Sequence, residues 1–154
     1  MISLDSTDKQ IVNLLQQNSK ANIKEIALKI GLTQTPTYER IKRLEKSGII
    51  KNYVAILDKE KAGFSVEVFC QVTLLVHSKE MITKFENAVN KIDEVVACFH
   101  VAGNYDYLLQ VIVKDMKSYQ IFLKNKLSVL DSVSNVQSTF VMTSTKEYSI
   151  IKMI

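Results

Sequence analysis

The segment NIKEIALKIGLTQTPTYERIKRLEKSGII, which ends at Ile50, constrains the fold of this chain more than any other part of its sequence. Its apolar residues recur at helical spacing in two short runs, and a turn with Gly31 lies between them. Asn22 is suited to cap the first helix and Thr33 the second, and Gly48 is suited to end the second helix. The segment therefore predicts a helix-turn-helix, a motif that can place its second helix in the major groove of DNA.

The second helix of this motif is expected to contact DNA with the face that points away from the core. Helical projection places Thr37, Ile41 and Leu44 inward and most of the charged side chains outward. Residues near the N-terminus of such a helix read base edges, whereas the basic residues that follow contact phosphates. The predicted DNA-contacting residues are Gln34, Thr35, Tyr38 and Glu39 for base edges, Arg40, Lys42 and Arg43 for phosphates, and Thr37 beside them.

The distribution of charge along the chain supports this interpretation. Residues 1–57 hold nine Lys or Arg against five Asp or Glu, whereas eleven basic residues are balanced by eleven acidic ones from Asp58 onward. A local positive charge favours phosphate contact and is not needed for folding. The alternative is a plain helical hairpin with a solvated basic face. A helix from Asp5 to about Gln17 would complete a three-helix core, and the β-prone residues 49–57 would follow as a strand or wing.

The hydrophobic pattern changes after a charged connector at residues 58–63, which indicates a domain boundary. Alternation of apolar and polar residues at 66–76 then predicts a half-buried strand, and later segments show helical spacing or further β-prone runs. The expected strands lie at 66–76, 95–102, 107–113 and about 136–145, and the expected helices lie at 81–92 and 119–130.

The order β-α-β-β-α-β is that of a ferredoxin-like domain. We therefore expect an α+β chain, with a winged helix-turn-helix domain and linker strand at residues 1–57 and a ferredoxin-like βαββαβ domain at residues 58–154. Both helices of the second domain cover one face of its sheet and leave the other face open. That face, with the apolar C-terminal residues, predicts a homodimer built on this domain. The apolar C-terminal residues are Ile150, Ile151, Met153 and Ile154.

Other classes of protein are less compatible with the sequence. The chain has no run of about 18 apolar residues, so no membrane span is expected. The first ten residues lack the layout of a secretory signal, so a cytoplasmic location is expected. In that compartment Cys70 and Cys98 are expected to be small buried hydrophobes, although a disulfide between them is possible.

An enzyme is the alternative from a different functional class. Cys98 and His100 alternate onto one face of a strand, close in sequence to Asp106, and could serve as nucleophile and base or as metal ligands. Two residues do not make a zinc site, His77 is remote in sequence, and the chain has no Gly-rich phosphate loop. We therefore expect no catalytic residues, no metal site and no cofactor.

Three sequence stretches resemble the Lrp/AsnC (feast/famine) transcriptional regulators. They are LDSTD at residues 4–8, TYERIKRLEKSGIIKNY in the second helix and beyond, and GNYDYLL at residues 103–109, in that order. The resemblance implies a winged helix-turn-helix, a linker strand and a C-terminal domain for effector binding and oligomerisation. It also implies dimers that assemble into octamers, double-stranded DNA bent around them, and amino acids as effectors.

The resemblance places the effector site in the segment Gly103, Asn104, Tyr105, Asp106 and Tyr107, at a contact between dimers. A glycine permits a close backbone approach, and the Asp106 carboxylate can accept from an ammonium group. The alternative is a simple β-turn flanked by tyrosines that pack in the core. The chain has Asn104 where the family often has an acidic residue. A protein that compacts DNA without an effector would share every DNA-binding feature, and only ligand titration separates the two functions.

Overall fold

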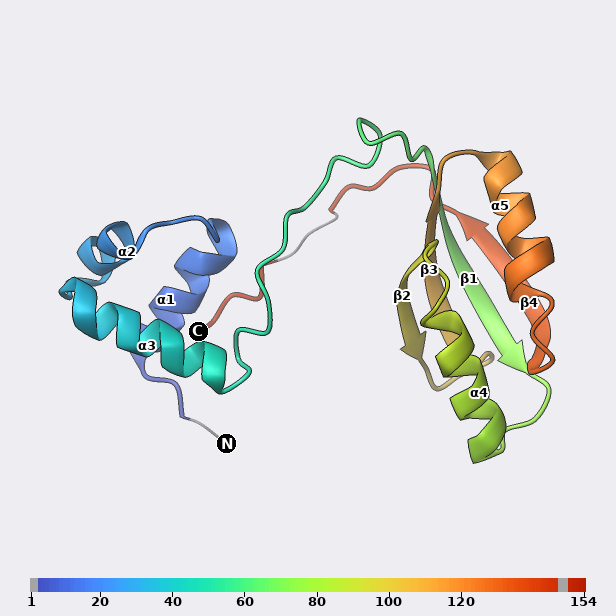
Figure 1. Cartoon of the computed structure of the whole chain (residues 1–154), viewed down its shortest axis with the longest axis horizontal. Helices are drawn as coiled ribbons and strands as arrows, with labels where there is room; N and C mark the ends of the chain where they lie inside the picture. The colour runs from blue at the N-terminus through green and yellow to red at the C-terminus, as the bar shows by residue number, and fades with distance from the viewer. Residues whose placement is uncertain (1–2, 147–149) are drawn as a thin grey trace. The chain divides into compact units, whose positions relative to one another are not determined.

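The computed structural model describes residues 3–146 and 150–154. The chain forms two compact units (Figure 1). Unit 1 consists of residues 1–56 together with residues 146–154, and unit 2 consists of residues 57–145. Unit 1 is thus discontinuous in sequence.

Unit 1 is built on three helices: α1 (Ser6–Gln17), α2 (Ile23–Ile30) and α3 (Gln34–Lys46). The Asn22 side chain accepts from the backbone N–H of Glu25 at 2.8 Å and so caps α2. Gly31 ends α2 with a φ of +69°, a backbone conformation that favours glycine. Both predicted signals are confirmed. Thr33 is the N-cap residue of α3, but its side chain makes no capping bond.

The core of unit 1 lies between the three helices. Ile11 of α1, Ile26 of α2 and Leu44 of α3 are almost completely buried and pack in one cluster. Val12 is also buried, whereas Leu14 is only half-buried and packs against this cluster. The three-helix core expected from sequence is confirmed.

The strand expected at residues 49–57 is not formed in this structure. Ile50 still packs against the unit 1 core, but the following residues are extended chain that joins no sheet of the described residues. Tyr53, Val54 and Ile56 are exposed. The physical reason is that an extended segment becomes a strand only when a neighbour pairs with its backbone groups, and β-propensity supplies no neighbour.

Unit 2 contains a four-stranded antiparallel sheet of order β2-β3-β1-β4. Two helical segments cover one face of this sheet, which gives the predicted ferredoxin-like arrangement (Figure 1). A single π-helical turn, η1, continues α5. The elements are β1 (Val66–Leu74), α4 (Lys79–Val89), β2 (Val95–His100), β3 (Tyr107–Val113), α5 (Met116–Phe122), η1 (Leu123–Leu127) and β4 (Val133–Phe140).

The register of the sheet explains its core. In β1 and β3 every second residue is buried, and Phe85 of α4 and Phe122 of α5 pack against these residues. Cys98 pairs with Leu109, and Leu109 pairs in turn with Cys70. A whole strand therefore separates the two cysteines, which is too far for a disulfide, and both thiols are free as expected.

Two expectations for the C-terminal part need correction. The last strand spans Val133–Phe140 rather than 136–145, because its pairing with β1 begins where Val133 lies opposite Leu74. The apolar tail was expected to accompany the open face of the sheet, but residues 150–154 lie with unit 1 along α1. In the described part of unit 2, no helix covers that open face (Figure 1).

Candidate DNA-binding and effector sites

The helix α3 presents most of its predicted DNA contacts to solvent. Gln34, Thr35, Tyr38, Glu39 and Lys42 are all exposed. The Lys42 ammonium lies 5.6 Å from the centre of the Tyr38 ring, one helical turn away, and 2.8 Å from a Glu45 carboxylate oxygen. These side chains form an exposed, mixed polar and basic face that can meet the edges and phosphates of a DNA groove.

Thr37 does not belong to this face. It is fully buried, and its hydroxyl donates to the Thr33 carbonyl at 2.8 Å. The hydroxyl thus bonds the preceding helical turn, as is common for threonine in helices. Thr37 supports the start of α3 and is not placed to touch DNA in this structure.

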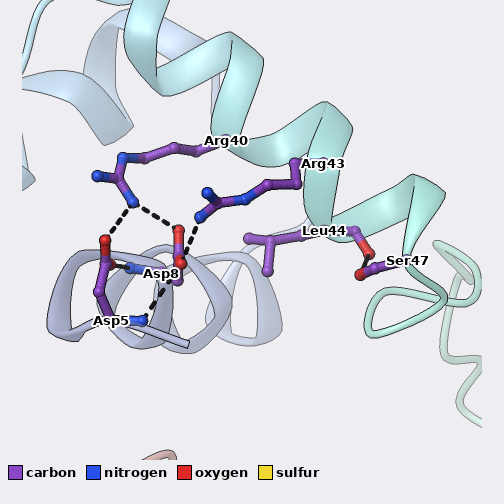
Figure 2. A network of polar contacts seen from close by, with 6 residues as sticks. All are labelled: Asp5, Asp8, Arg40, Arg43, Leu44 and Ser47. Atoms are coloured by element: carbon purple, nitrogen blue, oxygen red, sulfur yellow. Dashed lines mark hydrogen bonds and ion pairs between the residues drawn. The ribbon is translucent and has the colours of Figure 1, made fainter. Parts of the chain in front are cut away.

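Two arginines of α3 are held by acidic residues at the N-terminus of α1 (Figure 2). One guanidinium nitrogen of Arg40 lies 2.6 Å from Asp5 and 2.8 Å from Asp8. Arg43 lies 2.5 Å from the other oxygen of Asp8. The Asp8 side chain is only 1% exposed, and these two arginines are the oppositely charged groups that contact it. We call these four residues the acid–arginine clamp.

The acidic half of the clamp also caps α1. The Asp5 side chain accepts from the Asp8 backbone N–H at 2.7 Å, and the Asp8 side chain accepts from the Asp5 backbone N–H at 3.3 Å. This reciprocal pair is a capping box. The Asp8 backbone N–H and then the Arg40 guanidinium lower the pKa of Asp5, and the two carboxylates raise the pKa of Arg40.

The clamp changes the assignment of the arginines. Helical projection had placed Arg43 outward, yet Arg43 reaches α1 while half of its side chain remains exposed. Arg40 is more enclosed, with 28% of its side chain exposed. The sequence does contain a signal for the clamp. Asp5 and Asp8 are three residues apart, as are Arg40 and Arg43, so each pair lies on one stripe of its helix.

In unit 2 the predicted effector segment forms the loop between β2 and β3. Gly103 and Asn104 are exposed, whereas Tyr105 and Asp106 are half-buried. Gly103 has a φ of +155°, and a Cβ built there would meet nothing within 4 Å. The backbone at Gly103 is therefore open to approach by a small molecule or a neighbouring chain.

Asp106 anchors this loop to the end of β1. One carboxylate oxygen accepts from the Leu74 backbone N–H at 2.7 Å, and the other lies 2.7 Å from His77 Nε2. The Leu74 N–H and then His77 hold the pKa of Asp106 below its ordinary value. Each oxygen has a second lone pair, so the carboxylate can still accept from a ligand. The sequence alone gives His77 no such role, because its partner Asp106 lies 29 residues away along the chain.

Tyr107 is a core residue in this structure. It is 1% exposed, its hydroxyl donates to Glu86 at 2.8 Å, and its ring stacks on His100 at 4.7 Å. Burial, with the neighbouring Glu86, raises the pKa of the Tyr107 hydroxyl. Of the five predicted effector residues, Tyr107 is thus the one that the fold uses for packing.

The residues considered for catalysis do not form an activated group. Burial, and then the charge of Glu86, raises the pKa of the Cys98 thiol, which disfavours the nucleophilic thiolate. Within residues 3–146 and 150–154, no three His, Cys, Asp or Glu side chains gather as a metal ion would require. No helix of this described part is both long and apolar enough to cross a membrane.

Comparison with known proteins agrees with both halves of the fold. A family model described as winged helix-turn-helix DNA-binding matches residues 4–51, and one described as Lrp/AsnC ligand binding domain matches residues 67–151. The DNA-binding transcriptional activator DecR of Escherichia coli (strain K12) is 38% identical over 143 residues, which are 93% of this chain and 94% of that protein.

Two further relatives are associated with amino acids, one by its name and one by the ligand in its crystal structure. The leucine-responsive regulatory protein of Escherichia coli (strain K12) is 35% identical over 144 residues, which are 94% of this chain and 88% of that protein. The crystal structure of the transcriptional regulator NMB0573 from Neisseria meningitidis, in complex with L-Met, has a TM-score of 0.90 and 32% identity. The match covers 94% of each chain. These relatives are transcriptional regulators and not enzymes.

The buried carboxylate of the clamp generates a prediction about stability. Asp8→Asn keeps the size of the side chain but removes the charge that pairs with Arg40 and Arg43, so it should lower the free energy of unfolding by about 1.5–3 kcal/mol. Urea unfolding followed by circular dichroism measures this change. Asp131→Asn is the matched control, because Asp131 forms an exposed pair with Lys84 and should change stability by less than about 1 kcal/mol. Equal stability of Asp8→Asn and wild type would contradict the clamp.

The lowered pKa of Asp5 predicts a pH dependence. A carboxyl whose pKa is lower in the folded state stabilises that state above its unfolded pKa, which is ordinarily 3.8. This stabilisation is lost as the pH falls through the folded pKa. Asp5→Asn should therefore be less stable than wild type near neutral pH, and the difference should shrink in acid. Unfolding measured from pH 7 to pH 3 tests this, and a constant difference would count against it.

Proposed function

The chain belongs to the Lrp/AsnC family of DNA-binding transcriptional regulators, and we propose that it reads specific DNA with α3 and responds to an amino acid bound by unit 2. The exposed face of α3 is the observation that supports DNA binding. The acid–arginine clamp fixes the orientation of this helix. We also propose that the protein acts in the cytoplasm and has no catalytic activity, which the raised pKa of Cys98 supports.

The exposed residues near the start of α3 are proposed to read base edges. These are Gln34, Thr35, Tyr38 and Glu39, whose side chains lie in the first two turns. Lys42 and the exposed half of Arg43 are proposed to contact phosphates. Arg40 is proposed to act through Asp5 and Asp8 by holding α3 against α1, which revises its expected role as a phosphate contact.

Replacement of Lys42 tests the proposed orientation of α3 on DNA. Lys42→Ala should weaken binding to specific and random DNA alike and lower the slope of log affinity against log salt by about one. Thr35→Ala should instead change sequence preference, at about 1–3 kcal/mol for a lost base contact. Fluorescence anisotropy with a selected operator at several salt concentrations measures both effects.

Lys84→Ala is the control for Lys42→Ala, because Lys84 is an exposed basic residue of unit 2. It should leave the salt slope unchanged. If Lys42→Ala had the salt slope of wild type, α3 would not lie along the phosphates as proposed.

Assembly is proposed to use the open face of the sheet in unit 2. Phe99, Leu108 and Gln71 lie opposite one another across three strands on this face. Phe99 is 51% exposed, and Leu108 is only half-buried. An apolar surface of this kind is stabilised when a second copy covers it. We propose a homodimer formed in this way, which assembles further to an octamer.

The effector is proposed to be an amino acid that binds around Gly103, Asn104, Tyr105 and Asp106. Support comes from the relatives that respond to leucine or bind L-Met, and from the chemistry of the loop. The Asp106 carboxylate can accept from the ammonium group of an amino acid, and the open backbone at Gly103 leaves room beside it. A ligand shared between dimers would shift the balance between dimer and octamer and so change DNA binding.

Ligand titration tests the effector proposal. L-Met and L-Leu should raise the melting temperature of the full chain, because a ligand that binds the folded state stabilises it. Calorimetry should show about 10- to 150-fold weaker binding to Asp106→Asn, because a charge-assisted bond of about 1.5–3 kcal/mol is lost. Asp131→Asn should bind as wild type does, and sedimentation with and without ligand should show the shift in assembly.

The alternative function is an architectural protein that compacts DNA without an effector. If none of the twenty amino acids changed the melting temperature, the assembly or the DNA affinity, this alternative would replace the sensor. Equal affinity of wild type and Asp106→Asn for a ligand that does bind would place the effector site elsewhere.

A further inference from the structure

The C-terminal residues of the chain are bound along one side of α1. The Ile151 backbone N–H donates to the side-chain oxygen of Gln16 at 2.9 Å, and the Gln16 side-chain nitrogen donates to the Ile151 carbonyl at 2.9 Å. Asn13 holds Met153 in the same way, at 3.0 Å from the backbone N–H and 3.1 Å to the carbonyl. Each amide side chain thus satisfies both backbone groups of one residue, as a neighbouring strand would.

The spacing of these residues defines a continuous stripe on the helix. Lys9, Asn13 and Gln16 are four and three residues apart, which places them on one face of α1. Lys9 extends the stripe by donating from Nζ to the Ile154 carbonyl. Later residues of the tail meet earlier residues of the helix, so the tail runs antiparallel to α1.

Among residues 150–154, only one side chain joins the core. Met153 is half-buried and packs against the hydrophobic cluster of unit 1, whereas Ile151 and Ile154 are 74% and 95% exposed. Recognition of the tail therefore combines backbone hydrogen bonds with one apolar anchor. A flexible thioether side chain is well suited to fill an irregular gap between helices.

We propose that the Lys9–Asn13–Gln16 stripe of α1 is a docking site for an extended peptide, and that its occupant is residues 150–154 of the same chain. With the tail docked, the chain passes between the two units twice, because it leaves unit 1 after Ile56 and re-enters it at Lys146. It also joins the tail to the helix whose first turn holds Arg40 and Arg43.

Amide hydrogen exchange on the full chain, followed by NMR, tests the docking. In wild type the amides of Ile151 and Met153 should be protected. Gln16→Ala should speed exchange at Ile151 by about tenfold, and Asn13→Ala should do the same at Met153, because each variant removes a pair of hydrogen bonds. Gln17→Ala is the matched control: it removes the same type of exposed side chain from α1, one that makes no hydrogen bond to the described tail. It should leave both rates unchanged.

The docking site would be overturned if the amides of Ile151 and Met153 were unprotected in wild type. It would also be overturned if the Ile151 amide exchanged at the same rate in wild type and in Gln16→Ala. The origin of the tail is tested by amine cross-linking of an equal mixture of ¹⁴N and ¹⁵N protein after subunit exchange. Lys152 lies in the tail and Lys9 in the stripe, so their cross-linked peptides should be entirely light or entirely heavy. Mixed-isotope peptides would show that the tail comes from a second copy, which would overturn the assignment of the occupant.

Discussion

The buried carboxylate of Asp8 is the interaction on which the arrangement of unit 1 depends. A charge with 1% exposure is tolerated only when its partners neutralise it, and here both partners come from α3. The geometry is restrictive, because each carboxylate oxygen of Asp8 has its own arginine. The ion pairs therefore specify how α3 lies on α1, whereas the apolar contacts of Ile11 and Leu44 supply most of the burial energy.

The clamp also changes how the excess of basic residues in the first 57 positions should be interpreted. Four more basic than acidic residues in the first 57 residues suggested a surface available to phosphates. Two of those positive charges, on Arg40 and Arg43, form ion pairs within the domain. The acidic residues that they contact are also among the first 57 residues. The ion pairs do not change the net charge, so the electrostatic field around unit 1 stays positive. However, fewer basic side chains can contact a phosphate directly than the number of Lys and Arg residues implies. Lys42 is the clearest of them, since its acidic neighbour Glu45 lies on its own helix.

Local sequence signals predicted much of the fold. The caps at Asn22 and Gly31 and the alternation in β1 depend on neighbours within a few residues, and the structure contains all of them. The candidate sites could be predicted only in part, because the decisive contacts are distant in sequence. Arg43 meets Asp8 across 35 residues, and Asp106 meets Leu74 and His77 across 32 and 29. The prediction of a strand at residues 49–57 was wrong for a related reason, because β-propensity is a local property and a strand also needs a neighbouring strand to pair with.

The contrast between the two units explains why unit 1 relies on such specific contacts. Unit 2 buries a two-layer core of strands and helices, whereas the buried cluster of unit 1 is much smaller. A domain of about 60 residues buries a smaller fraction of its surface than a larger domain does, so its stability is marginal and each additional contact has a larger relative effect. The acid–arginine clamp and the C-terminal tail both add to α1, the first at its N-terminal turn and the second along its remaining length. A helix fixed on two sides can hold α3 in one orientation, which is what a protein that distinguishes DNA sequences requires, because base contacts are lost by small displacements of the reading helix.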